Sequence, residues 1–230
     1  MKKYIFGLIL LTGFFYLVFQ ENYKFTKAIE PAALLLPVWS GPETVNPFFV
    51  RSGFLNLTVT PFRRYTVSGL VMKAKRNSAL FSVLSEIRSV QPATVSLAFA
   101  DNLRTGAYKD VTNNLGGFNW PAKSVFNCGQ MQQIAIVTSD TETKIKICSL
   151  KPGDQVTLSG MCATQIEVFR KGDTSGQPSA TLKGEPNGSI LYLADASSVK
   201  ILQRGSRVSY NLFLLSGLLS VGMLFVKLKY

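Results

Sequence analysis

Short runs in which apolar and polar residues alternate recur through the middle of this chain. The clearest lies in residues 144–168, where Val156, Leu158 and Gly160 alternate with polar neighbours after a Lys-Pro-Gly-Asp turn at 151–154. A period of two is typical of a strand with one buried face, and Pro-Gly supplies the backbone angles of a tight turn. We therefore expect a strand, a turn and further strand in residues 144–168.

More short strands are expected on both sides of this stretch. Their patterns fall at 55–59, 64–73, 95–99, 133–138, 165–169, 190–193 and 199–202, with 133–138 and 144–147 forming a hairpin. Residues 77–91 have apolar positions at helical spacing, Ser78 at a capping position and Pro92 beyond the end. Together these patterns predict a mainly β domain over residues 61–205, a small OB-like β-barrel or sandwich with one short helix.

Both ends of the chain are strongly apolar. Residues 4–19 follow two lysines and contain no charge, and residues 210–226 are uncharged up to Lys227. Each run is close to the length of about 20 residues that spans a bilayer, so we expect transmembrane helices at 1–21 and 208–228. Lysines near both termini favour the cytoplasm, which predicts a two-pass bacterial inner-membrane protein with a periplasmic central domain. A buried core helix, or a removed signal peptide for the first run, is the alternative.

The second apolar run contains several small residues, and the segment that follows the first run contains several prolines. Ser216, Gly217 and Ser220 lie near helical spacing, which permits close packing against another helix. Residues 22–60 are rich in proline and phenylalanine, and we expect them to form a linker.

The composition shows a net positive charge and argues against chemistry that depends on histidine. The net charge of +12 suits an anionic partner, although the only local clusters form one possible basic contact patch of Arg63, Arg64, Lys73, Lys75 and Arg76. A solvated basic surface is the simpler interpretation. The chain has no histidine, so it lacks the commonest general base and metal ligand. We predict no catalytic, cofactor or metal site.

The three cysteines differ in their expected surroundings. Cys162 shares the strand face of Val156 and Leu158, so we expect it to be buried. Cys148 falls on the opposite face and Cys128 in a polar turn. A Cys128–Cys148 disulfide is therefore possible in an oxidising compartment, and reduced thiols are the alternative.

Five segments, in this order, resemble a group of uncharacterised bacterial membrane-anchored proteins with a small OB-like β domain. The segments are 65–71, 95–108, the region of Trp120, 151–160 and 179–199. The likeness covers about residues 65–200 at low identity and implies the same anchored β domain here. The sequence departs from the group's pattern at 100–102, near 127–130 and at 182–191. In the group's pattern, these positions carry the residues best suited to chemical activity.

These features favour a non-catalytic role. We expect a membrane-anchored structural or scaffold subunit of a bacterial envelope complex, such as a secretion or transfer system. Its partners would be other membrane proteins, in a hetero- or homo-oligomer, and the lipid bilayer; nucleic acid is not the expected partner. Two alternatives stay open: an OB-like module that stacks single-stranded nucleic acid on residues 62–65, and a diverged hydrolase using a carboxylate pair such as Asp140 and Glu142.

Overall fold

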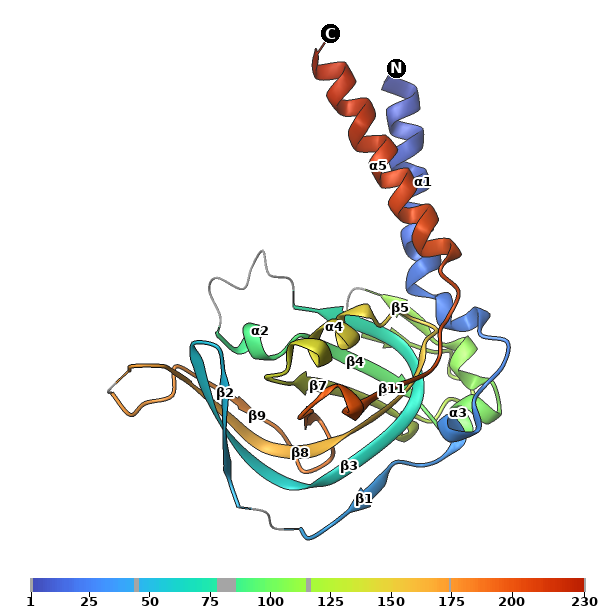
Figure 1. The fold of residues 1–230 in the computed structure, drawn as a ribbon. Coiled ribbons are helices and arrows are strands. Elements are labelled where there is room, and N and C mark those ends of the chain that lie inside the picture. Colours follow the sequence, from blue (N-terminus) through green and yellow to red (C-terminus); the bar gives the residue numbers. More distant parts are fainter. Residues whose placement is uncertain (1, 44–45, 78–85, 115–116, 174, 230) are drawn as a thin grey trace.

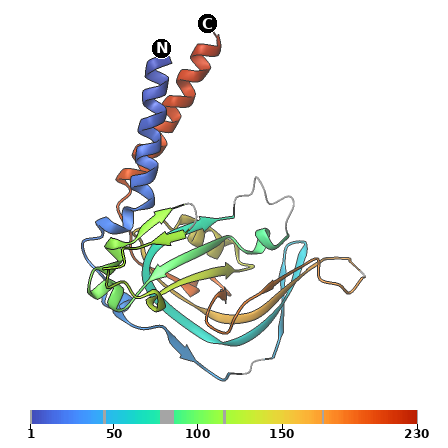
Figure 2. The ribbon, with the colours of Figure 1, turned by 180° about the vertical axis from the view of Figure 1, so that it is seen from behind.

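The structure, a computed structural model, describes residues 2–43, 46–77, 86–114, 117–173 and 175–229. Two long helices, α1 (Lys2–Gln20) and α5 (Val208–Lys229), lie side by side and project from a body built around one large sheet (Figure 1). The view from behind shows the same arrangement, with both termini at the far end of the helices (Figure 2).

The large sheet contains nine described strands, and a separate hairpin lies beside it. The nine are β1 (Val38–Ser40), β2 (Phe48–Ser52), β3 (Leu55–Arg76), β4 (Ala93–Ala98), β7 (Met131–Val137), β8 (Gln155–Arg170), β9 (Ala180–Lys183), β10 (Ile190–Tyr192) and β11 (Val199–Gln203). The hairpin joins β5 (Thr112–Asn114) to β6 (Gly117–Asn119). Residues 22–60, predicted to be a linker, thus contain β1, β2 and the start of β3.

Five of these strands close a ring. The long strand β3 pairs with β4 and with β8, β4 pairs with β7, and β10 joins β7 to β8. Among the strand pairs that the structure describes, only β7 and β10 are parallel. A strand that returns beside the first of three successive antiparallel strands makes a Greek key, here β8 beside β3. A five-stranded Greek-key barrel is the architecture of the OB fold.

The barrel is filled by side chains from all its strands and from one helix. Val67 and Val71 of β3, Leu97 of β4, Ile136 of β7 and Leu158 of β8 are fully buried in one cluster. The ladder between β3 and β4 shifts register between Val71 and Lys73. Such a shift bends a strand and increases its twist, and so helps β3 to contribute to both sides of the ring.

Short helices cover the barrel and connect its strands. They are α2 (Glu86–Val90), α3 (Asp101–Arg104), α4 (Thr141–Ser149), and the 3₁₀ turns η1 (Asn22–Phe25), η2 (Pro31–Leu34), η4 (Ala107–Asp110), η5 (Cys128–Gln130) and η6 (Ala196–Ser198). Buried Ile147 of α4, with Leu150 just after the helix, packs into the barrel core. The helix α4 therefore closes the interior between β7 and β8.

The predicted hairpin of 133–138 with 144–147 is wrong in its second half. Residues 144–147 belong to α4, because Asp140 caps that helix: its carboxylate accepts bonds of 2.7 Å from both the backbone N–H and the hydroxyl of Thr143. An aspartate at the N-cap satisfies N–H groups that a helix otherwise leaves unpaired. The predicted turn at 151–154 is confirmed by the bond from Asp154 N to Lys151 O and by the positive φ of Gly153.

The predicted flanking transmembrane helices are also wrong. Within the described residues, no helix combines the length and the apolar character needed to cross a membrane. This finding overturns the transmembrane segments at 1–21 and 208–228 and, with them, the two-pass inner-membrane location and the periplasmic placement of the domain. The prediction of a single short helix is wrong as well, since α1 to α5 are all helical. Of the helix predicted at 77–91, residues 78–85 lie outside the described residues.

The apolar runs instead form helices that pack on each other. Aromatic rings meet across the pair, with centroids 5.4 Å apart for Tyr16 and Phe213 and 5.1 Å apart for Phe19 and Tyr210. The hydroxyl oxygens of Thr12 and Ser220 are 3.5 Å apart, and a Cβ on Gly217 would lie 3.9 Å from Thr12.

The small residues Ser216 and Ser220 of α5 are both buried. Ser220, like Gly217, lies close to Thr12 of α1, so these positions contribute to the helix contact. Other apolar side chains of the pair are exposed, among them Leu17 and Leu218.

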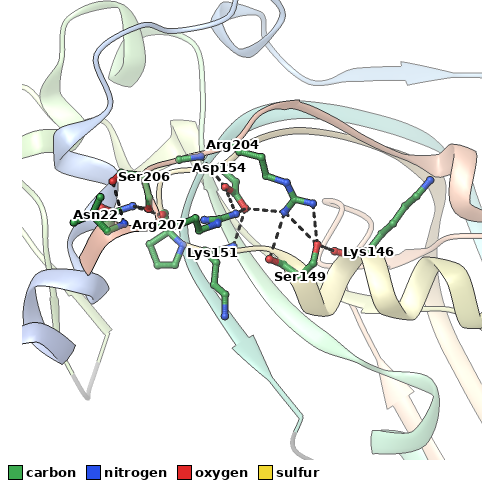
Figure 3. Close-up of polar contacts among 11 residues, drawn as sticks. Asn22, Lys146, Ser149, Lys151, Asp154, Arg204, Ser206 and Arg207 are labelled. Carbon is green, nitrogen blue, oxygen red and sulfur yellow. Dashed lines mark hydrogen bonds and ion pairs between the residues drawn. The ribbon is translucent and has the colours of Figure 1, made fainter. Parts of the chain in front are cut away.

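A buried carboxylate joins the helix pair to the barrel (Figure 3). Asp154 ends the turn before β8 and is fully buried. Its oxygens accept bonds from the backbone N–H groups of Lys151 (2.9 Å) and Gly205 (2.8 Å) and two bonds from Arg207 Nη2 (2.7 and 2.8 Å). Arg204 Nη1 lies 3.5 Å away. The carboxylate thus fixes the turn and the segment that leads into α5.

The start of the chain is tied to the same place through Asn22, just after α1. Its amide nitrogen donates to the carbonyl oxygens of Pro152 (3.0 Å) and Ser206 (2.8 Å). A Cβ on Gly205 would lie 2.6 Å from the backbone of Gly153, so glycine is needed where the two segments touch. Both long helices are therefore anchored on the turn at 151–154.

Replacing Asp154 with Asn removes the charge that pairs with Arg207. We expect Asp154→Asn to lower the free energy of unfolding by about 3 kcal/mol, because a guanidinium in a partly buried site loses its counter-charge. Urea denaturation followed by circular dichroism measures the change. The control is Glu142→Gln, which removes an exposed ion pair with Lys146 and should change stability by about 0.5 kcal/mol or less. Equal effects of the two substitutions would contradict the role of Asp154.

Candidate functional site

A large cleft opens where β1, β3, the start of β7 and the connection before β10 meet. Its volume is about 760 Å³. Aromatic side chains and amides line it: Trp39, Phe62, Tyr65, Phe99, Gln132, Gln133 and Asn187, with Arg63 and Ser189. We call it the aromatic cleft. A volume of this size is typical of ligand sites.

Strand pairing places the aromatic rings together. Trp39 of β1 lies directly opposite Tyr65 of β3, and side chains of directly opposed residues are close enough to touch. Their ring centroids are 4.4 Å apart at 44°, and Phe62 meets Trp39 edge-on at 5.9 Å. Trp39 and Phe62 remain partly exposed, so the cleft presents rigid aromatic surface to a ligand.

Amide groups hold the polar part of the cleft in place. The hydroxyl of Tyr65 donates to Oε1 of Gln132, and Nε2 of Gln132 donates to the carbonyl oxygen of Asn187. Gly188 has φ +84, and a Cβ there would lie 2.8 Å from the Tyr65 ring. Glycine at 188 therefore lets the connection before β10 close against Tyr65 and Gln132.

The aromatic cleft is close to electrically neutral. Burial raises the pKa of Tyr65 well above its ordinary value of 10.0, although the hydrogen bond to Gln132 opposes the shift, so the phenol keeps its proton. The one cation in the described lining, Arg63, lies 3.6 Å from Glu43 and donates to the carbonyl oxygen of Gly41. The described lining holds no carboxylate, cysteine or lysine, and so no nucleophile paired with a base.

A smaller cleft of about 190 Å³ lies on the outer face of β3, β4 and β7. Lys73, Ser96 and Gln133 sit side by side on the three strands, with Lys75 on the same face. Lys73 Nζ is 5.8 Å from the ring centroid of Phe118. Burial, and then repulsion from Lys75, lower the pKa of Lys73. Gln133 lines both this cleft and the aromatic cleft.

The structure does not gather the five predicted basic residues into one patch. Arg63 lines the aromatic cleft, whereas Arg64 lines a different cleft beside Tyr192. Lys73 and Lys75 lie on the outer face of the sheet, and Arg76 lines a cleft at the base of α1 and α5. Successive residues of a strand point to opposite faces, which separates neighbours such as Arg63 and Arg64.

All three cysteines are free thiols, so the possible Cys128–Cys148 disulfide is not formed in this structure. Cys128 is exposed in η5, and Cys148 is half-buried with its sulfur 4.0 Å from the carbonyl oxygen of Pro92. Cys162 is buried in the barrel core, as predicted.

The carboxylates suggested for hydrolysis have structural roles: Asp140 caps α4, and Glu142 pairs with Lys146 at 3.4 Å. No group of metal-ligating side chains large enough to hold an ion occurs among the described residues.

No protein-family model, curated protein or solved structure matches this chain. The resemblance to membrane-anchored OB-like proteins therefore stays a prediction. Sequence patterns pointed to Phe62, Arg63 and Tyr65 of this cleft but not to Trp39, Gln132 and Asn187. Trp39 lies in a proline-rich stretch that was assigned to a linker, and the two amides become neighbours of Tyr65 only through the ring of strands.

Tyr65 should titrate later than an exposed tyrosine. Above pH 10 an unfolded chain loses the phenolic proton that the folded chain keeps, so folding stability falls as pH rises above that value. We expect spectrophotometric titration of the folded protein to show tyrosines that stay protonated past about pH 11. The Tyr65→Phe variant should have one fewer of these late-titrating tyrosines. Loss of an early-titrating tyrosine in Tyr65→Phe would contradict the assignment.

Proposed function

We propose that this protein is a non-catalytic scaffold subunit that binds an extended segment of a partner protein in the aromatic cleft. The observation that carries the proposal is the close group of Trp39, Phe62 and Tyr65 beside the amides of Gln132 and Gln133. No pair of groups suited to catalysis accompanies it in the described lining.

An extended peptide fits the chemistry of this cleft. Peptides in the polyproline II conformation have a fully solvated backbone and dock into grooves lined with aromatic rings. Partly exposed rings such as Trp39 and Phe62 offer flat apolar surface, while the exposed Gln133 can donate to and accept from the peptide backbone. A rigid lining also limits the entropy lost on binding.

The charge of the cleft also favours a peptide. Single-stranded nucleic acid binds along a positively charged groove with aromatic platforms. Here the one cation is Arg63, which already has Glu43 and Gly41 as partners. A neutral ligand needs no further counter-charge at this site.

Single-stranded nucleic acid is the second candidate because of the outer face. Lys73 and Lys75 of β3 line a cleft with Phe118 of β6, on the face that β3 shares with β4 and β7. The second and third strands of an OB barrel, here β4 and β7, form the face on which OB folds bind oligonucleotides. The two candidate surfaces meet at Gln133, so one probe at that position reports on both.

Photo-crosslinking from position 133 tests the proposal. With a benzophenone amino acid in place of Gln133 in the full chain, expressed in its own cells, we expect a protein adduct of defined mass. We expect Trp39→Ala to reduce it about tenfold or more, since an aromatic contact residue contributes about 2 kcal/mol or more to binding. Trp120→Ala, the chain's other tryptophan, should leave the adduct unchanged.

Two results would contradict the peptide proposal. An adduct that nuclease treatment removes, and that depends on Lys73 and Lys75, would favour nucleic acid on the outer face. A protein adduct that persists in Trp39→Ala, or that forms equally from the exposed position of Val125, would show that the aromatic cleft is not the binding surface.

A further inference from the structure

A second polar cleft lies where the helix pair meets the barrel. It has a volume of about 270 Å³, and its lining comes from four parts of the chain. Phe19 and Gln20 end α1, Tyr210 lies in the first turn of α5, Arg76 ends β3, and Lys151 begins the turn before β8. We call it the junction cleft.

The junction cleft has two cations and no carboxylate in its described lining. Neither Arg76 nor Lys151 forms an ion pair with a described residue. The acid nearest to Lys151 in sequence, Asp154, already accepts from Arg207, Gly205 and the backbone of Lys151. Glu21, which follows Gln20, pairs with Lys24 at 3.1 Å. Figure 3 shows the Lys151 side chain extending away from the Asp154 carboxylate. The positive charge of the junction cleft is therefore not balanced by Asp154.

The surroundings of Lys151 show the effect of this imbalance. Its Nζ lies 3.7 Å from the ring centroid of Tyr210 and 5.8 Å from that of Phe19. Aromatic faces stabilise a cation but do not neutralise it. Burial first, and then repulsion from Arg76 and Arg207, lower the pKa of Lys151, while Tyr210 opposes the shift. Arg207 also keeps a buried nitrogen, Nη1, without a hydrogen-bond partner.

We propose that the junction cleft binds a phosphate group between Arg76 and Lys151. A guanidinium presents paired N–H donors that match phosphate oxygens, and an ammonium adds a compact charge. The phosphate would supply the negative charge that the lining lacks. Its source is either a free phosphate compound or a phospholipid headgroup, which share this chemistry.

Chemical labelling of Lys151 tests the site in the full chain. Acetic anhydride modifies neutral lysine amines, and mass spectrometry reports each lysine separately. A bound phosphate favours the charged ammonium and covers it. With inorganic phosphate at about ten times its Kd, we expect labelling of Lys151 to fall about tenfold, with sodium chloride at equal ionic strength giving no such fall. Labelling of Lys200, outside this cleft, is the internal control.

Two variants separate the site from general charge. Arg76→Gln should abolish the protection, whereas Lys75→Gln, one residue away and outside this cleft, should leave it intact. Both positions are exposed, so neither substitution should prevent folding. In a parallel arm, vesicles of phosphatidylglycerol are compared with phosphatidylcholine, whose headgroup has no net charge.

Protection by inorganic phosphate assigns a free phosphate as the source. Protection by phosphatidylglycerol vesicles without protection by inorganic phosphate assigns a headgroup. Absence of protection in every arm, or protection that survives in Arg76→Gln, would overturn the proposal. None of these results depends on the aromatic cleft.

Discussion

The arrangement of this molecule depends on the buried carboxylate of Asp154. Removing a carboxylate from water is costly unless charge and hydrogen bonds replace the lost hydration. Here two backbone N–H groups and the guanidinium of Arg207 replace it. Because these donors come from the turn before β8 and from the segment before α5, the carboxylate is satisfied only when the two segments are together. The carboxylate thereby joins the turn at 151–154 to the segment that leads into α5, about 50 residues later in the chain.

The long strand β3 distributes the functional groups over the surface. It pairs with β4 and β8 in the ring, and its first half also pairs with β1 and β2. Because its side chains alternate between the two faces of the sheet, Arg63 lines the aromatic cleft and Arg64 lines another cleft. Arg76, at the end of β3, lines the junction cleft. Five basic residues that are close in sequence therefore serve separate surfaces. The positive charge of the chain is spread out, although two cations face a common space in the junction cleft and two more do so on the outer face of the sheet.

Local signals in the sequence predicted local structure well. The turn at 151–154 and the buried position of Cys162 follow from Pro-Gly chemistry and a period of two, and both are found. The alternation in residues 144–147 favours a strand, but the cap by Asp140 makes this segment part of the helix α4. The apolar ends are close to the length of a membrane span, but no helix among the described residues combines that length with enough apolar character to cross a membrane. The aromatic cleft and the role of Asp154 depend on contacts across more than 25 residues of sequence, which no local pattern carries.

A double-mutant cycle between Asp154 and Arg207 tests the central claim most directly. The free energies of unfolding are measured by urea denaturation for the wild-type chain, Asp154→Asn, Arg207→Gln and the double variant. If the pair joins the two segments, the single effects do not add, and the coupling energy is about 1.5–3 kcal/mol. Additive effects, with a coupling energy within about 0.5 kcal/mol of zero, would show that the carboxylate and the guanidinium act independently and would contradict the account.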